Sequence, residues 1–235
     1  MMIHLLSDTA NGHTFLEGFR FIADNAGFLA RKALQQLELA GAGLGVGAAV
    51  ALPTGILLGH LHRGSGIAIG ASIFGRALPI VLLIAIFLTI LGIGFTNNMV
   101  ALAVLATGPM LTTAYEGVDG VDRDVTDAAR GMGMSWLQIL GRVELPLALP
   151  LLFTGIRISA VAVVATAPIA AIAGGGGLGD VIVNPASYRL EGVLGACYCV
   201  MALSAGVWIA LLALQKALTP RPLRSNSVLG TGDLS

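Results

Sequence analysis

The sequence predicts an all-α membrane protein, on the basis of its composition and the lengths of its apolar segments. Of the 235 residues, 56% are hydrophobic and 11% are charged, with a mean hydropathy of +0.87. A soluble domain with a solvated surface does not have this composition. Crossing a bilayer takes about 20 apolar residues as a helix. Five segments meet this length, at residues 37–61, 77–95, 98–115, 147–173 and 193–215.

Residues 1–36 are predicted to form an N-terminal tail and an amphipathic helix on the membrane surface. Their apolar residues recur at steps of three and four, with charged residues between them. These charges argue against a sixth crossing, and no cleavable signal peptide is evident. The apolar positions are Phe15, Phe19, Ile22, Ala26, Leu29 and Ala33.

The first span is rich in glycines four residues apart, which allow helices to approach closely in lipid. These glycines could serve packing within the chain or a contact between two copies, and both interpretations stay open. The pairs are Gly41 with Gly45, Gly43 with Gly47, and Gly55 with Gly59.

The second and third spans come from residues 77–115, which contain no charged residue. Four residues typical of turns interrupt this run, and we expect them to join the two spans tightly. They are Gly92, Gly94, Asn97 and Asn98.

Positively charged residues predict the orientation of the spans. Most of them fall in alternate connections and in the C-terminal tail, so the positive-inside rule places the loop 116–146 and the C-terminus in the cytoplasm. Five spans then leave the N-terminus outside. The positively charged residues in these positions are Arg63, Arg123, Arg130, Arg142, Lys216, Arg221 and Arg224.

The C-terminal tail, residues 219–235, is rich in proline, serine and glycine and is expected to be disordered.

The loop 116–146 is predicted to form a helix, a glycine turn and a second helix. Asp122 or Asp124 can cap the first helix, and Gly131 and Gly133 lie where it would end. The S-x-x-Q spacing that begins at Ser135 is that of a capping box, and it starts a helix that runs toward Pro146. The first helix has an apolar stripe at i, i+3, i+4 and i+7, formed by Val125, Ala128, Ala129 and Met132.

Helices this short are marginal in water, so the stripe must be buried against something. The cytoplasmic ends of the chain's own helices could cover it. A groove on another protein could also cover it, with Met132 or Trp136 as anchors. Composition does not decide between these two partners.

Ionisable residues in or near the spans need partners. A cation at the centre of a span, such as Arg157, costs about 2.5 to 3.5 kcal/mol when unpaired. Glu144 and Glu116 are candidate partners, and a structural ion pair and a role in a gate both stay open. We interpret His60 and His62 as solvated interfacial residues.

Residues 174–180 contain a G-x-G-x-x-G spacing, which in a soluble α/β protein indicates a dinucleotide site. No strand precedes it here, so we interpret it as a flexible, close-packed connection after the fourth span. Cys197 and Cys199 point to different faces of a helix, and no metal site is expected. The net charge of zero argues against a nucleic-acid partner.

The pattern D-A-A-x3-G-x9-V-x-L-P closely resembles the E-A-A-x3-G-x9-I-x-L-P signature of the membrane subunits of binding-protein-dependent ABC importers. In that family the first short helix docks into a cleft of a cytoplasmic ATPase. Asp127 and Val143 depart conservatively from the family's Glu and Ile. The resemblance implies that the ATPase-coupling residues are Asp127, Ala128, Ala129, Met132, Gly133, Leu145 and Pro146.

Residues 91–182 also resemble the osmoprotectant branch of that family, which imports glycine betaine, choline and carnitine. The resemblance implies a five-span core of the MetI-like type within residues 37–218, in a bacterial inner membrane. It also implies a second permease subunit, an ATPase dimer that binds ATP and magnesium, and an extracytoplasmic binding protein. That binding protein would dock near Gly176, Gly177, Gly179 and Asp180.

Two further expectations concern chemistry. No P-loop occurs, so this chain would be a non-catalytic subunit without a cofactor of its own. Only 6% of its residues are aromatic, so an aromatic cage for a quaternary amine is expected in the binding protein instead.

The alternative substrate class for such an importer is methionine, phosphonate or sulfonate. An autonomous channel or ion-coupled transporter fits the uncharged spans less well.

Overall fold

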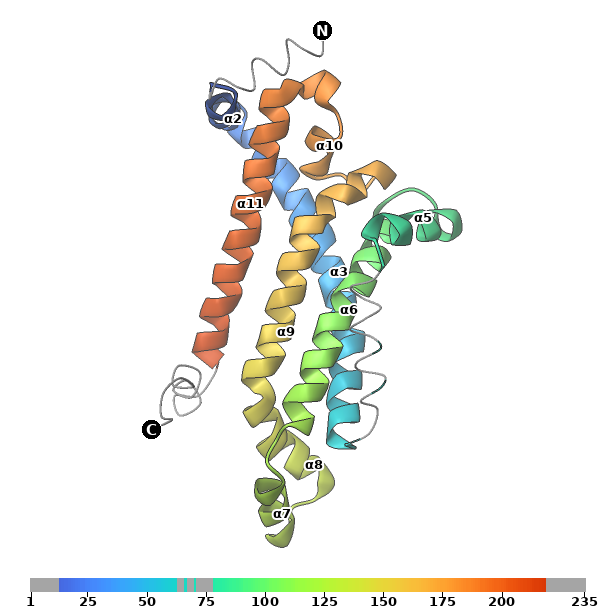
Figure 1. The fold of residues 1–235 in the computed structure, drawn as a ribbon, viewed down its shortest axis with the longest axis vertical. Coiled ribbons are helices and arrows are strands. Elements are labelled where there is room, and N and C mark those ends of the chain that lie inside the picture. Colours follow the sequence, from blue (N-terminus) through green and yellow to red (C-terminus); the bar gives the residue numbers. More distant parts are fainter. Residues whose placement is uncertain (1–12, 63–65, 67–69, 71–77, 219–235) are drawn as a thin grey trace, which may run out of the picture. The chain divides into compact units, whose positions relative to one another are not determined.

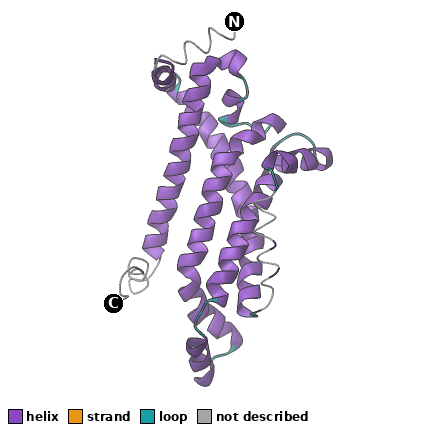
Figure 2. Cartoon of the chain, viewed as in Figure 1, coloured by secondary structure: helices purple, strands orange, loops and turns teal. Residues whose placement is uncertain are grey.

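The computed structural model describes residues 13–62, 66, 70 and 78–218, and every regular element within these ranges is a helix (Figure 1, Figure 2). The prediction of an all-α fold is confirmed. The elements are α2 (His13–Asp24), α3 (Ala26–His60), α5 (Ile80–Leu91), α6 (Phe95–Asp119), α7 (Arg123–Gly131), α8 (Trp136–Ile139), the π-helix η1 (Leu140–Glu144), α9 (Leu145–Thr166), the 3-10 helix η2 (Ala167–Ala173), α10 (Gly179–Ile182) and α11 (Pro185–Leu218).

Four helical runs in the described part are long and apolar enough to cross a membrane, which makes this a multi-pass membrane protein. The expected second span, 77–95, contains α5, whose 12 residues are fewer than the roughly 20 that a crossing needs. Residues 71–77 lie outside the described ranges. The count of five spans therefore stays a prediction. The four runs are Ala26–His60, Phe95–Asp119, Trp136–Ala173 and Pro185–Leu218.

The predicted N-terminal surface helix is two helices. The chain turns at Asn25, whose side-chain amide donates a hydrogen bond to the carbonyl of Phe21 at 3.1 Å. α3 then runs without a break through residue 36, so the expected boundary between surface helix and first span lies inside it. The apolar periodicity missed the turn because both helices keep their apolar residues at steps of three and four.

The described residues form two compact units. Of the described residues, the first unit comprises 13–46, 78–105 and 160–207. The second unit comprises 47–62, 66, 70, 106–159 and 208–218.

The first unit contains the turn between α5 and α6. Gly92 and Gly94 make this turn with φ of 76° and 136°, values that favour glycine. Asn97 and Asn98 were expected in the turn, but they lie in the first turns of α6 and are buried. The amide of Asn98 donates to the carbonyl of Ala173 at 3.1 Å, which ties the start of α6 to the end of η2. From its position in α6, the side chain of Asn98 supplies a hydrogen-bond donor to this carbonyl. The tendency of asparagine to occur in turns does not reveal such a contact.

The second unit has a core formed by α6 and α9, with Ala114, Val118, Ala148 and Leu152 at its centre. α3 packs closely on α6 through Gly59 and Gly55. A Cβ atom at Gly55 would lie 2.6 Å from the carbonyl oxygen of Leu111. This pair of glycines therefore serves packing within the chain. In the first unit, by contrast, Gly41 and Gly45 face open space among the described residues.

Candidate functional site

The first helix of the loop, α7, begins and ends as predicted. The carboxylate of Asp122 accepts a hydrogen bond from the backbone N–H of Asp124 at 2.9 Å, so Asp122 is the N-cap. The helix ends at Gly131. Gly133 then adopts φ of 82°, and the backbone N–H of Met134 donates to the carbonyl of Ala129 at 3.2 Å. The predicted helix and glycine turn are confirmed.

The second arm of the loop begins as predicted but does not end there. The side chain of Gln138 accepts a hydrogen bond from the backbone N–H of Ser135 at 2.8 Å, as expected for a capping box. From Trp136 the chain stays helical through α8, η1 and α9 to Thr166. Pro146 does not stop it, because the wider turns of η1 immediately before the proline accommodate the missing N–H. The second arm is thus continuous with a membrane-spanning helix.

The four apolar positions predicted on one face of α7 divide into two groups. Ala129 is buried, with 2% of its surface exposed, and packs beside Thr126 on the inner side of the helix. Val125, Ala128 and Met132 are exposed, and we call them the outer face. The exposed fraction reaches 72% at Met132, so the described residues of this chain leave the outer face uncovered.

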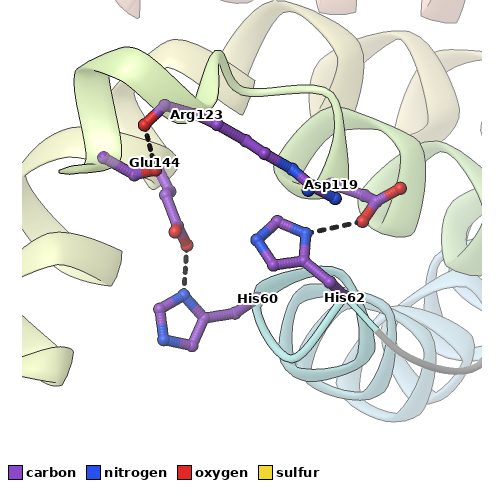
Figure 3. A network of polar contacts seen from close by, with 6 residues as sticks. His60, His62, Asp119, Arg123 and Glu144 are labelled. Carbon is purple, nitrogen blue, oxygen red and sulfur yellow. Dashed lines mark hydrogen bonds and ion pairs between the residues drawn. The ribbon is translucent and has the colours of Figure 1, made fainter.

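A buried polar pair lies where the loop meets the end of α3. Nδ1 of His60 hydrogen-bonds to Oε2 of Glu144 (Figure 3). Both side chains are buried, with 6% and 3% of their surfaces exposed. The edge of the Trp136 indole meets the imidazole, with ring centroids 4.7 Å apart. The interpretation of His60 as a solvated residue is therefore wrong, because Glu144 and Trp136 cover it.

A second histidine pair lies at the rim of the same region. Nδ1 of His62 lies 2.8 Å from Oδ1 of Asp119, and both side chains are about one-third exposed (Figure 3). Salt screening and hydration weaken such an exposed contact. A polar cavity of about 250 Å³ separates α7 from the histidines and is lined by His60, His62, Thr126, Arg130, Met134, Trp136, Ile139 and Glu144.

Arg157 does not pair with Glu144, so that candidate ion pair is wrong. Both residues belong to one helical run and are 13 positions apart, which separates them by about 20 Å along the axis. The guanidinium of Arg157 instead donates to Oε1 of Gln215 at 2.9 Å and lies over the ring of Trp208, 5.9 Å from its centroid. These partners from α11 were missed because neither carries a negative charge.

The glycine-rich connection after the fourth span is close-packed, as expected. Gly174, Gly176 and Gly177 have φ between 72° and 78°. A Cβ atom on Gly175 would lie 2.7 Å from the carbonyl oxygen of Ala170. Asp180 forms an ion pair with Lys32 of α3, with 2.6 Å between Nζ and Oδ2. No sequence pattern indicated this pair, whose residues are 148 positions apart.

Comparison with known proteins agrees with this architecture. Residues 51–224 match the family described as the binding-protein-dependent transport system inner membrane component. The carnitine transport permease protein OpuCB of Listeria monocytogenes is 36% identical over 205 residues, which cover 87% of this chain and 94% of the relative. The glycine betaine/carnitine/choline transport system permease protein OpuCB of Bacillus subtilis is 31% identical over the same shares of the two chains.

A solved structure shows the same fold. The chain superposes on a structure of the MetNI methionine ABC transporter in inward-facing conformations with a TM-score of 0.70. The match covers 82% of this chain and 96% of that one, at 23% identity, and shows the fold alone. The fold expected from the sequence, that of the MetI-like permeases, is confirmed. The chain belongs to the family of inner membrane components of binding-protein-dependent transport systems.

Proposed function

We propose that this protein is the permease subunit of an ABC importer for osmoprotectants that are quaternary amines, such as glycine betaine, carnitine or choline. Relatives that are 31% to 36% identical to it are permeases of carnitine, glycine betaine and choline transport. ATP hydrolysis takes place in a partner ATPase dimer. The observation that carries the assignment to an ABC importer is the exposed apolar outer face of α7, on a hairpin that the buried pair of His60 and Glu144 attaches to α3.

The outer face is the surface that docks into the ATPase. Ala128 and Met132 make the contact, and Asp127 lies beside them with its carboxylate 66% exposed. The other signature residues shape the hairpin. Ala129 packs inward, Gly133 makes the turn, and Leu145 and Pro146 begin α9 at the base.

Two connections transmit a displacement of the hairpin to the spans. The first is covalent, because α8, η1 and α9 are one continuous helical run. The second is the buried pair of His60 and Glu144, which attaches the base of the hairpin to the last residue of α3. ATP-driven closure of the two ATPase subunits would move both helices together and alternate the access of the pathway.

The remaining partners complete the complex. A second permease subunit, identical or closely related, forms the other half of the pathway. An extracytoplasmic binding protein docks near Gly176, Gly177, Gly179 and Asp180 and delivers the substrate. In this arrangement the hairpin and the C-terminus are cytoplasmic and the N-terminus is outside, in agreement with the positive-inside rule.

Uptake by the reconstituted transporter tests the proposal. Proteoliposomes would hold this permease with its ATPase and binding protein, and uptake of radiolabelled glycine betaine, carnitine, choline and methionine would be compared. We expect ATP-dependent uptake of at least one quaternary amine and none of methionine. Uptake of methionine alone would replace this substrate class with the alternative. Uptake without ATPase would contradict the assignment to an ABC importer.

A matched pair of variants tests the outer face. Val125 and Leu61 are apolar and similarly exposed, at 44% and 47%, but only Val125 belongs to the outer face. We expect Val125→Asp to abolish most uptake by placing an unpaired charge in the docked interface. Leu61→Asp should keep uptake close to that of the unmodified protein. Equal uptake by both variants would contradict docking through this face.

A further inference from the structure

α2 and the start of α3 lie beside α11 (Figure 1), and aromatic side chains of the first unit make contacts between these helices. Phe19 stacks on Tyr198 with ring centroids 4.6 Å apart, and Phe28 stacks on Tyr188 at 5.8 Å. Phe21 packs on α11 where Gly192 leaves room for it. A Cβ atom on that glycine would lie 3.1 Å from the end of the ring. The sequence did not predict these contacts, because each joins two residues that are more than 150 positions apart.

One of these stacks borders a cavity. Its volume is about 410 Å³, within the range of about 300 to 1,000 Å³ that is usual for small-molecule sites. Aromatic, amide, hydroxyl and charged groups all contribute to its walls. It is lined by Phe21, Asn25, Phe28, Ser187, Tyr188, Arg189 and Glu191.

Aromatic side chains, which line part of this cavity, are the groups that typically bind a quaternary ammonium ion. Such a group has no N–H to donate, and aromatic ring faces together with a nearby negative charge are what recognise it. Phe21, Phe28 and Tyr188 supply the rings. Glu191 supplies the negative charge, and its side chain is 30% exposed.

The charges of the cavity favour a zwitterion over a simple cation. Arg189 and Glu191 form an ion pair, with 3.2 Å between the guanidinium and the carboxylate. A ligand with both charges can place its ammonium group by Glu191 and its carboxylate by Arg189, so both residues keep a partner. A simple cation contacts Glu191 only and leaves the guanidinium to water. Because the side chain of Arg189 is 81% exposed, the resulting preference for a zwitterion is small.

The backbone at Arg189 supports a role in binding. This residue has φ of 55° and ψ of 178°, a conformation that is almost confined to glycine. Non-glycine residues in such conformations occur mainly at functional sites, where the surrounding structure holds the strain. A glycine would relieve the strain at this position but would remove the guanidinium.

We propose that this cavity binds a zwitterion that carries a trimethylammonium group and a carboxylate, such as glycine betaine or carnitine. This proposal rests on the proposed function. Phe21, Phe28, Tyr188 and Glu191 hold the ammonium group, and Arg189 holds the carboxylate. In the proposed orientation the cavity lies on the extracytoplasmic side, where it receives the solute that the binding protein releases.

Saturation-transfer NMR on the purified complex of permease and ATPase, without binding protein, tests the cavity directly. The N-methyl protons of glycine betaine report weak binding to aromatic side chains. Maltoside micelles are required, because phosphocholine detergents carry the same headgroup. We expect a signal for glycine betaine that 3,3-dimethylbutyrate, its carbon isostere without the positive charge, does not displace. Displacement by equal concentrations of the isostere would overturn recognition of the ammonium charge.

Conservative variants separate binding from folding. Tyr188→Phe keeps the ring and should keep the signal, whereas Tyr188→Leu keeps bulk without the ring and should raise the Kd by about 5- to 30-fold. Phe19→Ala removes a ring of the other stack, which does not line the cavity, and should leave the Kd unchanged. Equal Kd values for Tyr188→Leu and Phe19→Ala would overturn the site.

Arg189→Gly tests the carboxylate end. We expect this variant to unfold at a higher temperature and to raise the Kd of glycine betaine by about 2- to 5-fold, because an exposed ion pair contributes little. The Kd of choline, which has no carboxylate, should not rise. A rise of the same size for choline would overturn the role of Arg189.

The experiments distinguish an error in the proposed binding cavity from an error in the proposed function. Betaine uptake by the complete transporter, together with Kd values unaffected by the Tyr188 variants, would overturn the cavity and leave the function standing. A complete transporter that takes up no quaternary amine would overturn the proposed function.

Discussion

His60 and Glu144 form a buried hydrogen-bonded pair, although 84 positions separate them in the chain. His60 is the last residue of α3, and Glu144 is the last residue of η1, at the base of the hairpin. A buried carboxylate that loses its partner is costly, so the pair holds the hairpin in one position relative to α3.

A double-mutant cycle tests this pair. We expect His60→Leu to lower the free energy of unfolding by about 3 to 5 kcal/mol, because it leaves the carboxylate of Glu144 buried and unpaired. Adding Glu144→Leu should restore part of the loss, since both buried polar groups are then removed. Unfolding in mixed micelles measures each variant. Strictly additive losses would show that the two side chains do not interact.

The turn of the hairpin offers a second test. Gly133 has φ of 82°, and a Cβ atom added there would have no neighbouring atom within 4 Å, so only backbone strain opposes a side chain. We expect Gly133→Ala to weaken the hairpin by about 1 to 2 kcal/mol. Gly131→Ala, in the last turn of α7, should stabilise it by up to about 1 kcal/mol.

Amide hydrogen exchange measures both glycine variants. Exchange at the N–H of Met134, which bonds to Ala129 across the turn, should become faster in Gly133→Ala and no faster in Gly131→Ala. The same exchange rate in both variants would show that the positive φ of Gly133 does not limit the turn.

The glycines of α3 provide a third test. Gly55→Leu should destabilise the second unit by about 1 to 3 kcal/mol, because its side chain would collide with the backbone of α6. Gly45→Leu should change stability by less than about 0.5 kcal/mol, because that glycine faces open space. Thermal unfolding of the purified permease compares them. Similar melting temperatures for the two variants would contradict the packing of α3 on α6.

The hairpin could be predicted from the sequence because its signals are local. The cap at Asp122, the capping box from Ser135 to Gln138, and the glycine turn each lie within a few residues of what they shape. The spacing of the apolar stripe also placed Ala129 in α7 and Met132 at its end. It did not show that Ala129 is buried and Met132 exposed, since that depends on which side faces the base of the hairpin.

The remaining contacts could not be predicted because they join distant parts of the chain. The partner of Arg157 is Gln215, which is 58 positions away and uncharged, so charge complementarity does not identify it. His60 was misread because a histidine at the end of a span is usually solvated. The aromatic stacks join helices from the two ends of the sequence.

The continuity of the hairpin with its span was also missed. Pro146 suggested a break, because proline lacks the N–H of a helical hydrogen bond. The π-helix η1 lies directly before it and keeps the run helical. Propensity rules treat each proline separately and do not anticipate such a local rearrangement.

Cysteine crosslinking from the outer face tests the central claim most directly. Met132→Cys and the buried Ala129→Cys would be made after Cys197 and Cys199 are replaced by alanine. In the complete transporter, Met132→Cys should crosslink to the ATPase subunit, and Ala129→Cys should not. Crosslinks from Met132→Cys that reach only this chain, in a complex that still takes up substrate, would contradict docking of the ATPase on the outer face.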